Sequence, residues 1–308
     1  MITKGDRIAF MLIGFLLIVT FVFWDDVERI VTHRPQPVQQ KEMAKKDKKK
    51  NSKKEKENTE ASAAVSILKK WDMPSQLLEI SGIVYIDDQR IARVQDELGK
   101  IYIYNTEDEK VEKEISFGKP GDYEGIAVVG PTAYVLRADG TLFEVKDYKS
   151  NPSVVQHATH LTAKQDVEGL TYDQKNNRLL LAIKGKETNS TDYKGIYAFD
   201  LATKKTATEP VHKINLSHAL FSEVKGKNKI EPSDIDIHPH TGDIYITDGA
   251  DPKILVMNSD GTEKNIYQLS KSEFAQPEGI TFSPAGDLFI SNEGRKGTGN
   301  NLKVSITP

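Results

Sequence analysis

The sequence predicts an all-β fold, a β-propeller of about five four-stranded blades, with six blades as the alternative. Three observations predict it. A short turn recurs five times along residues 71–308, most of the intervals between its copies are close to 44 residues, and short apolar strands follow each copy. Three to four antiparallel strands in such a unit are typical of a propeller blade, whereas a β-sandwich lacks one turn at a constant period.

The recurring turn reads Glu-Ile-Ser-Gly-Ile in its first copy and Asp-Tyr-Glu-Gly-Ile in its second. The intervals between equivalent positions are 43, 44, 65 and 45 residues, counted from Gly82, Gly125, Gly169, Asp234 and Gly279. The long interval fits one unit plus an insertion at residues 207–232. Six blades would require a degenerate blade inside this interval, so we expect five.

Each turn is followed by an apolar strand, a bend rich in Pro, Gly, Asn or Asp, and a second alternating strand, which is the pattern of a β-hairpin. Third strands are expected at 100–105, 141–145, 195–201, 253–258 and 301–306, and fourth strands at 111–117 and 265–270. We expect residues 71–78 to close the ring against the last blade. A short helix is expected at 217–224, within the insertion.

An apolar run of 17 residues, IAFMLIGFLLIVTFVFW at 8–24, precedes the repeats. As a helix it spans about 25 Å, enough for a short transmembrane segment. A cleavable signal peptide is the alternative, but it needs small residues where this run ends in Phe23 and Trp24. We expect a single-pass anchor in the inner membrane, with residues 1–7 in the cytoplasm. The propeller then faces the periplasm or the exterior, since long C-terminal domains translocate largely regardless of charge.

Residues 25–70 form a Lys-rich linker before the propeller domain at 71–308. The middle of this linker holds too few apolar side chains to offset its ordering entropy, so we expect a tether. Contact with anionic lipid headgroups or cell-wall polymer is the functional alternative.

The charge is divided unevenly along the chain. Residues 1–70 carry 15 Lys and Arg against 9 Asp and Glu, and the remainder carries 27 against 36. An acidic body argues against nucleic acid as a partner, because nucleic acid binding needs a basic surface. The chain has no cysteine, which excludes disulfides, Cys-ligated zinc and thiol catalysis.

The series EISGI, DYEGI, DVEGL, PSDIDIHP and QPEGITFSP, in this order and each followed by hairpin strands, resembles the SdiA-regulated family. The resemblance covers essentially the whole repeat region. It implies a bacterial protein with an N-terminal membrane segment and a calcium-binding propeller, and it implies no demonstrated reaction. The fourth turn departs from the pattern, since Ser233-Asp234 replaces Glu-Gly and places the carboxylate one position later.

Carboxylates recur at these turns, and equivalent positions of successive blades converge on one mouth of the central channel. Carboxylates gathered there repel one another unless a cation neutralises them, and Ca²⁺ takes six to eight oxygen ligands. The alternative is that each acid accepts backbone N–H bonds within its own turn. The candidate calcium ligands are Glu79, Asp96, Glu124, Glu168, Asp234 and Glu278.

A second polar position recurs at the end of the second strand of each unit. Side chains there that face the same mouth would supply polar contacts to a ligand, and an Arg or Lys would meet a carboxylate or phosphate group. The alternative is that these side chains are polar only because they precede a tight bend. The candidate ligand-binding residues are Arg137, Lys184, Asp248, Asn292 and Glu293.

The sequence contains no G-x-S-x-G elbow, P-loop or G-x-G-x-x-G motif, and it identifies no catalytic residue. We therefore expect a calcium-binding module that binds a small molecule or an envelope partner. A calcium-dependent hydrolase of phosphoesters, esters or lactones is the second hypothesis, with the ion activating water. A structural scaffold in the cell envelope is the third.

Overall fold

The computed structural model describes residues 65–307 except 223, 225–228 and 295–296. The expected membrane segment at 8–24, the residues before it and most of the expected linker lie outside the described residues. Within the described part of the chain, no helix is long and apolar enough to span a membrane.

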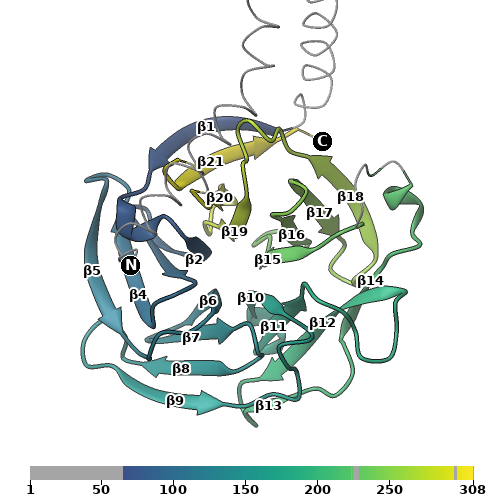
Figure 1. Ribbon diagram of the computed structural model, residues 1–308, viewed down its shortest axis with the longest axis horizontal. Coiled ribbons are helices and arrows are strands. Elements are labelled where there is room, and N and C mark those ends of the chain that lie inside the picture. Colours follow the sequence, from purple (N-terminus) through teal and green to yellow (C-terminus); the bar gives the residue numbers. More distant parts are fainter. Residues whose placement is uncertain (1–64, 223, 225–228, 295–296, 308) are drawn as a thin grey trace, which may run out of the picture. The chain divides into compact units, whose positions relative to one another are not determined.

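Five antiparallel sheets surround a central channel, with β2, β6, β10, β15 and β19 as their innermost strands (Figure 1). The first blade contains β2 (Ile80–Asp87), β3 (Arg90–Gln95), β4 (Lys100–Asn105) and β5 (Lys110–Ser116). The second contains β6 (Tyr123–Val129), β7 (Thr132–Arg137), β8 (Leu142–Lys146) and β9 (Ser153–His157). The expected five blades are thereby confirmed, and the six-bladed alternative is wrong.

The third blade contains β10 (Val167–Asp173), β11 (Arg178–Ile183), β12 (Tyr193–Asp200), β13 (Lys205–Thr206) and β14 (His212–Asn215). Its outer position is shared, because β13 and β14 both pair with β12. The fourth blade contains β15 (Pro232–Ile237), β16 (Ile244–Asp248), β17 (Lys253–Met257) and β18 (Glu263–Gln268). The insertion before it contains β14 and one 3₁₀ turn, η3 (Ala219–Phe221), in place of the expected longer helix.

The fifth blade joins the two ends of the propeller. It contains β19 (Pro277–Phe282), β20 (Leu288–Asn292), β21 (Asn300–Ile306) and, outermost, β1 (Val65–Asp72), which pairs antiparallel with β21. The closing strand thus begins before the expected domain boundary at residue 71, and Ser75–Leu77 forms a 3₁₀ turn, η1. The difference arises because most side chains between Val65 and Trp71 face solvent, so their polar residues resemble linker.

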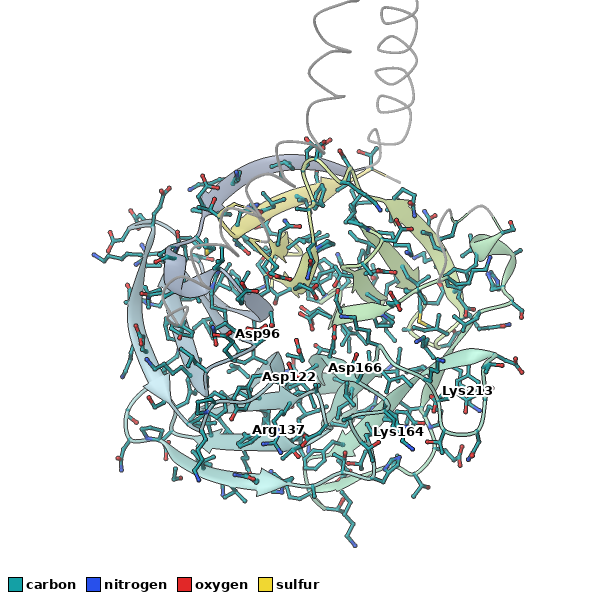
Figure 2. All side chains as sticks on the ribbon, viewed as in Figure 1. Asp96, Asp122, Arg137, Lys164, Asp166 and Lys213 are labelled. Atoms are coloured by element: carbon teal, nitrogen blue, oxygen red, sulfur yellow. The ribbon has the colours of Figure 1, made fainter. Side chains whose placement is uncertain are left out.

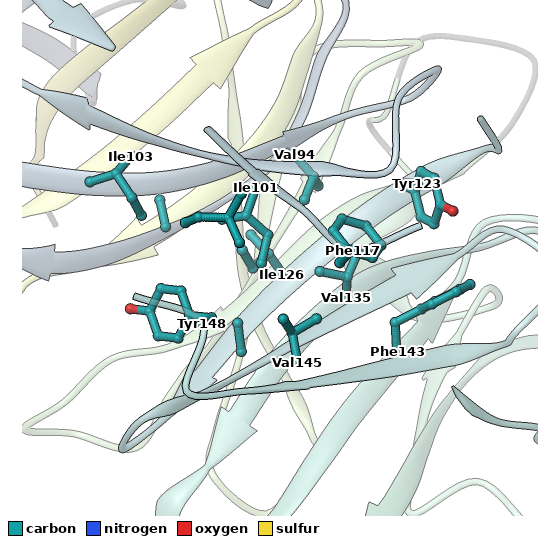
Figure 3. Packing of buried hydrophobic residues seen from close by; sticks show 13 residues of the cluster. Val94, Ile101, Ile103, Phe117, Tyr123, Ile126, Val135, Phe143, Val145 and Tyr148 are labelled. Atoms are coloured by element: carbon teal, nitrogen blue, oxygen red, sulfur yellow. The ribbon is translucent and has the colours of Figure 1, made fainter. Parts of the chain in front are cut away.

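The hydrophobic core is divided into clusters that fill the spaces between neighbouring blades. Between the first and second blades, Phe117, Tyr123 and Phe143 pack with ring centroids 4.9 to 5.6 Å apart (Figure 3). Such edge-on aromatic pairs contribute about 0.5–1.5 kcal/mol each beyond burial. Residues 58–308 form one compact unit, and both strands of the ring closure lie within it, so this segment contains the complete propeller core.

The recurring glycine lies where the innermost strands approach one another near the channel axis. Each innermost strand has a register shift near its start, in the second blade between Tyr123 and Gly125. A Cβ on Gly125 would lie 2.6 Å from Leu170 Cβ and 2.9 Å from Glu168 O of the next blade. The glycine is therefore required for close packing of blade against blade, as is common at bulges.

The fourth blade has Asp234 in the position of this glycine. Its Oδ1 accepts hydrogen bonds from Leu170 N of the third blade (3.3 Å) and from Ile235 N (2.8 Å). Its Oδ2 accepts one from Ile280 N of the fifth blade (2.9 Å). One carboxylate thus connects three blades and satisfies edge amides of innermost strands that no further strand covers.

Candidate cation site at the channel mouth

A cavity of about 170 Å³ lies at the end of the channel where the innermost strands begin. Its lining comes from the first, second, third and fifth blades and consists of Glu79, Ile80, Ser81, Asp96, Glu124, Glu168, Lys184, Gln276, Glu278 and Glu293. We call the six carboxylates in this lining the acidic mouth. Figure 2 shows Asp96 near the central opening, with Asp122 and Asp166 also close to it.

Five of the expected calcium ligands meet in this cavity: Glu79, Asp96, Glu124, Glu168 and Glu278. Asp234 does not line it, because its carboxylate lies between the blades and accepts the three backbone bonds described above. For Asp234 the structure therefore shows the alternative interpretation, in which the acid accepts backbone N–H bonds. The later position of this carboxylate in the fourth turn accounts for the difference.

Two of the expected ligand-binding residues, Lys184 and Glu293, also line the cavity. Arg137 lies farther out over the second blade (Figure 2), where Nη2 and Nε donate to Asp139 Oδ2 (2.7 Å) and Oδ1 (3.1 Å). Asp248 is buried and its Oδ2 lies 2.7 Å from Lys253 Nζ. Asn292 is also buried and donates to Asn300 Oδ1 (2.9 Å).

Ser81 and Gln276 also line the cavity, although neither was among the expected calcium ligands. Each occupies a turn position where other units carry an acid, and this equivalence was the available signal. Gln276 Nε2 donates to Glu293 Oε2, which ties one side of the mouth to the end of β20.

Lys184 supplies a positive charge to the acidic mouth, and its Nζ lies 2.7 Å from Glu168 Oε1. Glu168 is only 4% exposed, and its second oxygen, Oε2, is buried without a hydrogen-bond partner in the described part of the chain. Asp96 Oδ1 is likewise buried and unpaired among the described residues. An unpaired buried carboxylate oxygen is costly, so both atoms require a partner such as water or a cation.

Burial and crowding raise the carboxyl pKa values at this mouth. Burial, together with the charge of Glu168, raises the pKa of Glu124 to about 10. Burial, together with the charge of Glu79, raises the pKa of Asp96 to about 6. Burial also holds the pKa of Glu168 well above its usual range. At neutral pH the acidic mouth therefore retains protons that a cation would displace.

Lys184 stays charged in this setting. Burial acts to lower its pKa, but the charges of Glu168 and Glu278 outweigh burial, and the pKa rises above its usual range. Lys184 thus supplies one positive charge, and the protons that Glu124 and Glu168 retain remove part of the negative charge of the acidic mouth. In the described residues, no group of three or more His, Asp or Glu side chains is arranged to hold a metal ion as the side chains stand. A cation in this mouth would therefore have to draw the carboxylates toward itself.

Comparison with known protein families identifies the family to which the chain belongs. The model of the SdiA-regulated family matches residues 67–295, which includes the innermost strands of all five blades. The chain belongs to the SdiA-regulated family. The match begins within β1, so it includes most of the ring-closing strand, part of which was expected to be linker.

Among solved structures, the propeller of this SdiA-regulated protein is similar to glutaminyl cyclase from Myxococcus xanthus. The TM-score is 0.56 at 14% identity, over 79% of this chain and 97% of the cyclase. Virginiamycin B lyase from Staphylococcus aureus gives a TM-score of 0.42 at 14% identity, over 74% of this chain and 68% of the lyase. The likeness to the cyclase supports the fold alone. No curated protein matches the sequence.

Proposed function

We propose that this SdiA-regulated propeller binds a divalent cation at its acidic mouth and presents the bound ion to a small-molecule or envelope ligand. The observation that carries the proposal is the pair of buried, unpaired carboxylate oxygens, Glu168 Oε2 and Asp96 Oδ1, which line one cavity together with four further acids. Two such atoms in one acidic cavity fit a cation with oxygen ligands.

Calcium fits this set of side chains best. The donors are carboxylate, amide and hydroxyl oxygens, which suit hard cations, and the lining includes no cysteine or histidine. Glu124, Glu168 and Glu278 come from three different blades and would hold the ion, with Glu79 and Asp96 completing the set. When bound, the ion would supply a Lewis-acidic point for an anionic ligand group. Lys184 would orient such a group through its ammonium.

A calcium-dependent hydrolase of phosphoesters, esters or lactones is the second candidate function, and a basic residue beside the carboxylates, Arg137 or Lys184, would support it. Lys184 lies in the acidic mouth with Nζ 2.7 Å from Glu168 Oε1, whereas Arg137 is paired with Asp139 away from the cavity. Lys184 therefore supports the hydrolase and Arg137 does not.

We also propose that the propeller is held outside the cytoplasm by the apolar run at 8–24 as a single-pass inner-membrane anchor. The support is the sequence alone, a charge-free run long enough to cross the hydrocarbon core. Protease added to intact spheroplasts should digest the propeller. Protection until the membrane is lysed would contradict this location.

The cation proposal is tested on residues 58–308 by thermal unfolding with Ca²⁺ or with a chelator. Calcium should raise the unfolding temperature, because a ligand that binds only the folded state stabilises it. Glu168→Gln should remove the shift. Glu114→Gln, which alters an exposed acid of β5 on the rim, is the matched control and should keep it. An equal unfolding temperature with calcium and chelator would overturn the proposal.

A further inference from the structure

The opposite end of the channel carries a second cavity, of about 340 Å³, lined by the innermost strands of all five blades. We call it the apolar mouth. Its lining is dominated by aliphatic and aromatic side chains such as Val84, Ile86, Val128, Ile237 and Phe282. Several of them are only partly buried, so this surface is accessible from the channel end.

A larger cavity, of about 700 Å³, adjoins the apolar mouth between the third and fourth blades. We call it the His cleft, after His212, His238 and His240 in its lining. The two cavities share the lining residues Tyr172, Gln174, Ile237 and Pro239. They therefore adjoin one another, with the apolar mouth over the channel and the more polar His cleft between the blades.

His238 stands where the two parts meet. Its ring packs against Phe282 of the apolar mouth, with ring centroids 5.0 Å apart. Its Nδ1 accepts hydrogen bonds from His240 N (3.3 Å) and Thr241 N (3.2 Å). The neutral ring therefore carries its proton on Nε2, which makes that nitrogen a donor.

The positive charge of the His cleft comes from Lys175 and Arg178. The only acid in its lining is Asp173, which is engaged within its own turn. Asp173 Oδ2 accepts from Arg178 Nε (2.8 Å) and Asn176 Nδ2 (2.7 Å), and its Oδ1 accepts from Asn176 N (3.3 Å).

The apolar mouth also contains one lining acid, Asp236, and this acid is engaged as well. Its Oδ1 accepts from Thr171 Oγ1 (2.6 Å) and Ile237 N (2.8 Å), and its Oδ2 accepts from Phe282 N (2.8 Å). Arg178 donates to Asp173 through Nε, so the two cations and one acid of the His cleft leave one unbalanced positive charge there, offered by Lys175 and the remaining guanidinium donors of Arg178. This charge favours an anion.

We propose that the apolar mouth and the His cleft together bind a small amphipathic anion, a molecule with an aliphatic or aromatic body and one carboxylate, phosphate or sulfate group. The body covers the apolar mouth. The anionic group lies in the His cleft, near Lys175 and Arg178. This site is at the other end of the channel from the acidic mouth and does not depend on the cation proposed there.

The probe for this site is decanoate, titrated into residues 58–308 by isothermal calorimetry below its micellar concentration. Acetate tests the anion without the apolar body, and decyltrimethylammonium tests the body with the charge reversed. Decanoate should bind in a 1:1 complex, while acetate and decyltrimethylammonium should bind at least about tenfold more weakly. Equal binding of decanoate and decyltrimethylammonium would overturn the proposal, since charge would then play no part.

Single substitutions test whether the anionic group of decanoate binds in the His cleft. Lys175 is exposed in the 3₁₀ turn η2 (Gln174–Asn176), so Lys175→Gln leaves the fold intact and should weaken decanoate binding about threefold to tenfold. Arg178→Gln should weaken it by at least as much. Lys110→Gln, at an exposed lysine of β5, is the matched control and should leave the dissociation constant unchanged. If Lys175→Gln and Arg178→Gln both bind decanoate like the unaltered protein, the anion does not bind in the His cleft.

Discussion

The two mouths lie at opposite ends of the innermost strands, yet they have opposite chemistry. Where the innermost strands begin, Glu124, Glu168 and Glu278 converge with other acids. Where these strands end, aliphatic and aromatic side chains such as Val128 and Phe282 replace them. A propeller can thus carry two different binding surfaces at the two ends of its channel. This is possible because the turn before each innermost strand and the hairpin after it are separate segments of the sequence.

Asp234 lies between these two ends and serves neither cavity. Its carboxylate is connected to the third and fifth blades, so the fourth blade contributes blade-to-blade hydrogen bonds where the others contribute a close-packed glycine. This asymmetry leaves the acidic mouth without an acid from the fourth blade. The uneven repeat thereby makes the candidate cation site off-centre.

The largest effect is expected from Asp234→Gly, which restores the glycine of the other blades. It leaves the amides of Leu170, Ile235 and Ile280 without their acceptor, at a cost of about 3–5 kcal/mol in the free energy of unfolding. Urea unfolding of residues 58–308 measures this. Asp108→Gly, in the exposed β4–β5 turn, is the control and should cost below about 1 kcal/mol. Equal losses for the two variants would refute a connecting role for Asp234.

Glu124→Gln tests whether the acidic mouth and the apolar mouth bind their ligands independently. It removes one carboxylate from the acidic mouth and should weaken calcium binding on the order of tenfold or more, because affinity follows the number of charged ligands. Decanoate binding at the other end should not change. Lys175→Gln should show the converse pattern, with calcium affinity preserved. Calorimetric titrations of both variants with both ligands measure this, and a loss of both affinities in either variant would show that the two mouths are coupled.

The pH dependence of stability should differ with and without calcium. The pKa of Asp96 is raised to about 6 and that of Glu124 to about 10, so the folded state binds more protons than the unfolded state above about pH 4. In a chelator, stability should therefore fall as pH rises from 5 to 8. For the half-exposed Asp96 the loss is on the order of 1 kcal/mol after solvent screening. Calcium should reduce this loss, and urea unfolding at several pH values measures both. A chelated protein that gains stability over this range would contradict the raised pKa values.

The smallest effect is expected from Lys184→Gln. Lys184 Nζ lies 2.7 Å from Glu168 Oε1 and competes with a cation for this carboxylate. Its removal should strengthen calcium binding a few-fold, since a like charge near the ion is lost. Lys194→Gln is the control, because Lys194 lies nearby but donates to the carbonyls of Lys184 and Gly185. Weaker calcium binding by Lys184→Gln would mean that the lysine organises the site.

The spacing of the five turns was sufficient to predict the blades, because each blade repeats the same local hairpins. It was insufficient for β1, whose exposed side chains resemble the charged segment before it and whose partner, β21, lies at the far end of the chain. The role of Asp234 was also beyond the sequence. Its hydrogen-bond donors Leu170 and Ile280 are 64 and 46 residues away, and no local pattern reports them.

The candidate site was predictable as far as the repeat placed side chains at equivalent positions. Glu124, Glu168 and Glu278 therefore meet as expected. Arg137 was assigned by the same equivalence, but its neighbour Asp139 binds its guanidinium through two hydrogen bonds. Whether a side chain pairs with a neighbour or faces the channel depends on rotamers and distances, and the spacing of a repeat does not determine these.

The most direct test of the cation site is a calcium titration of residues 58–308 by calorimetry at pH 7, repeated in two buffers of different ionisation enthalpy. We expect one bound ion and a release of protons, because the ion displaces protons held by Glu124 and its neighbours. Glu124→Gln should lower the number of protons released. Saturating calcium that gives no binding heat and no proton release in either buffer would contradict the central claim.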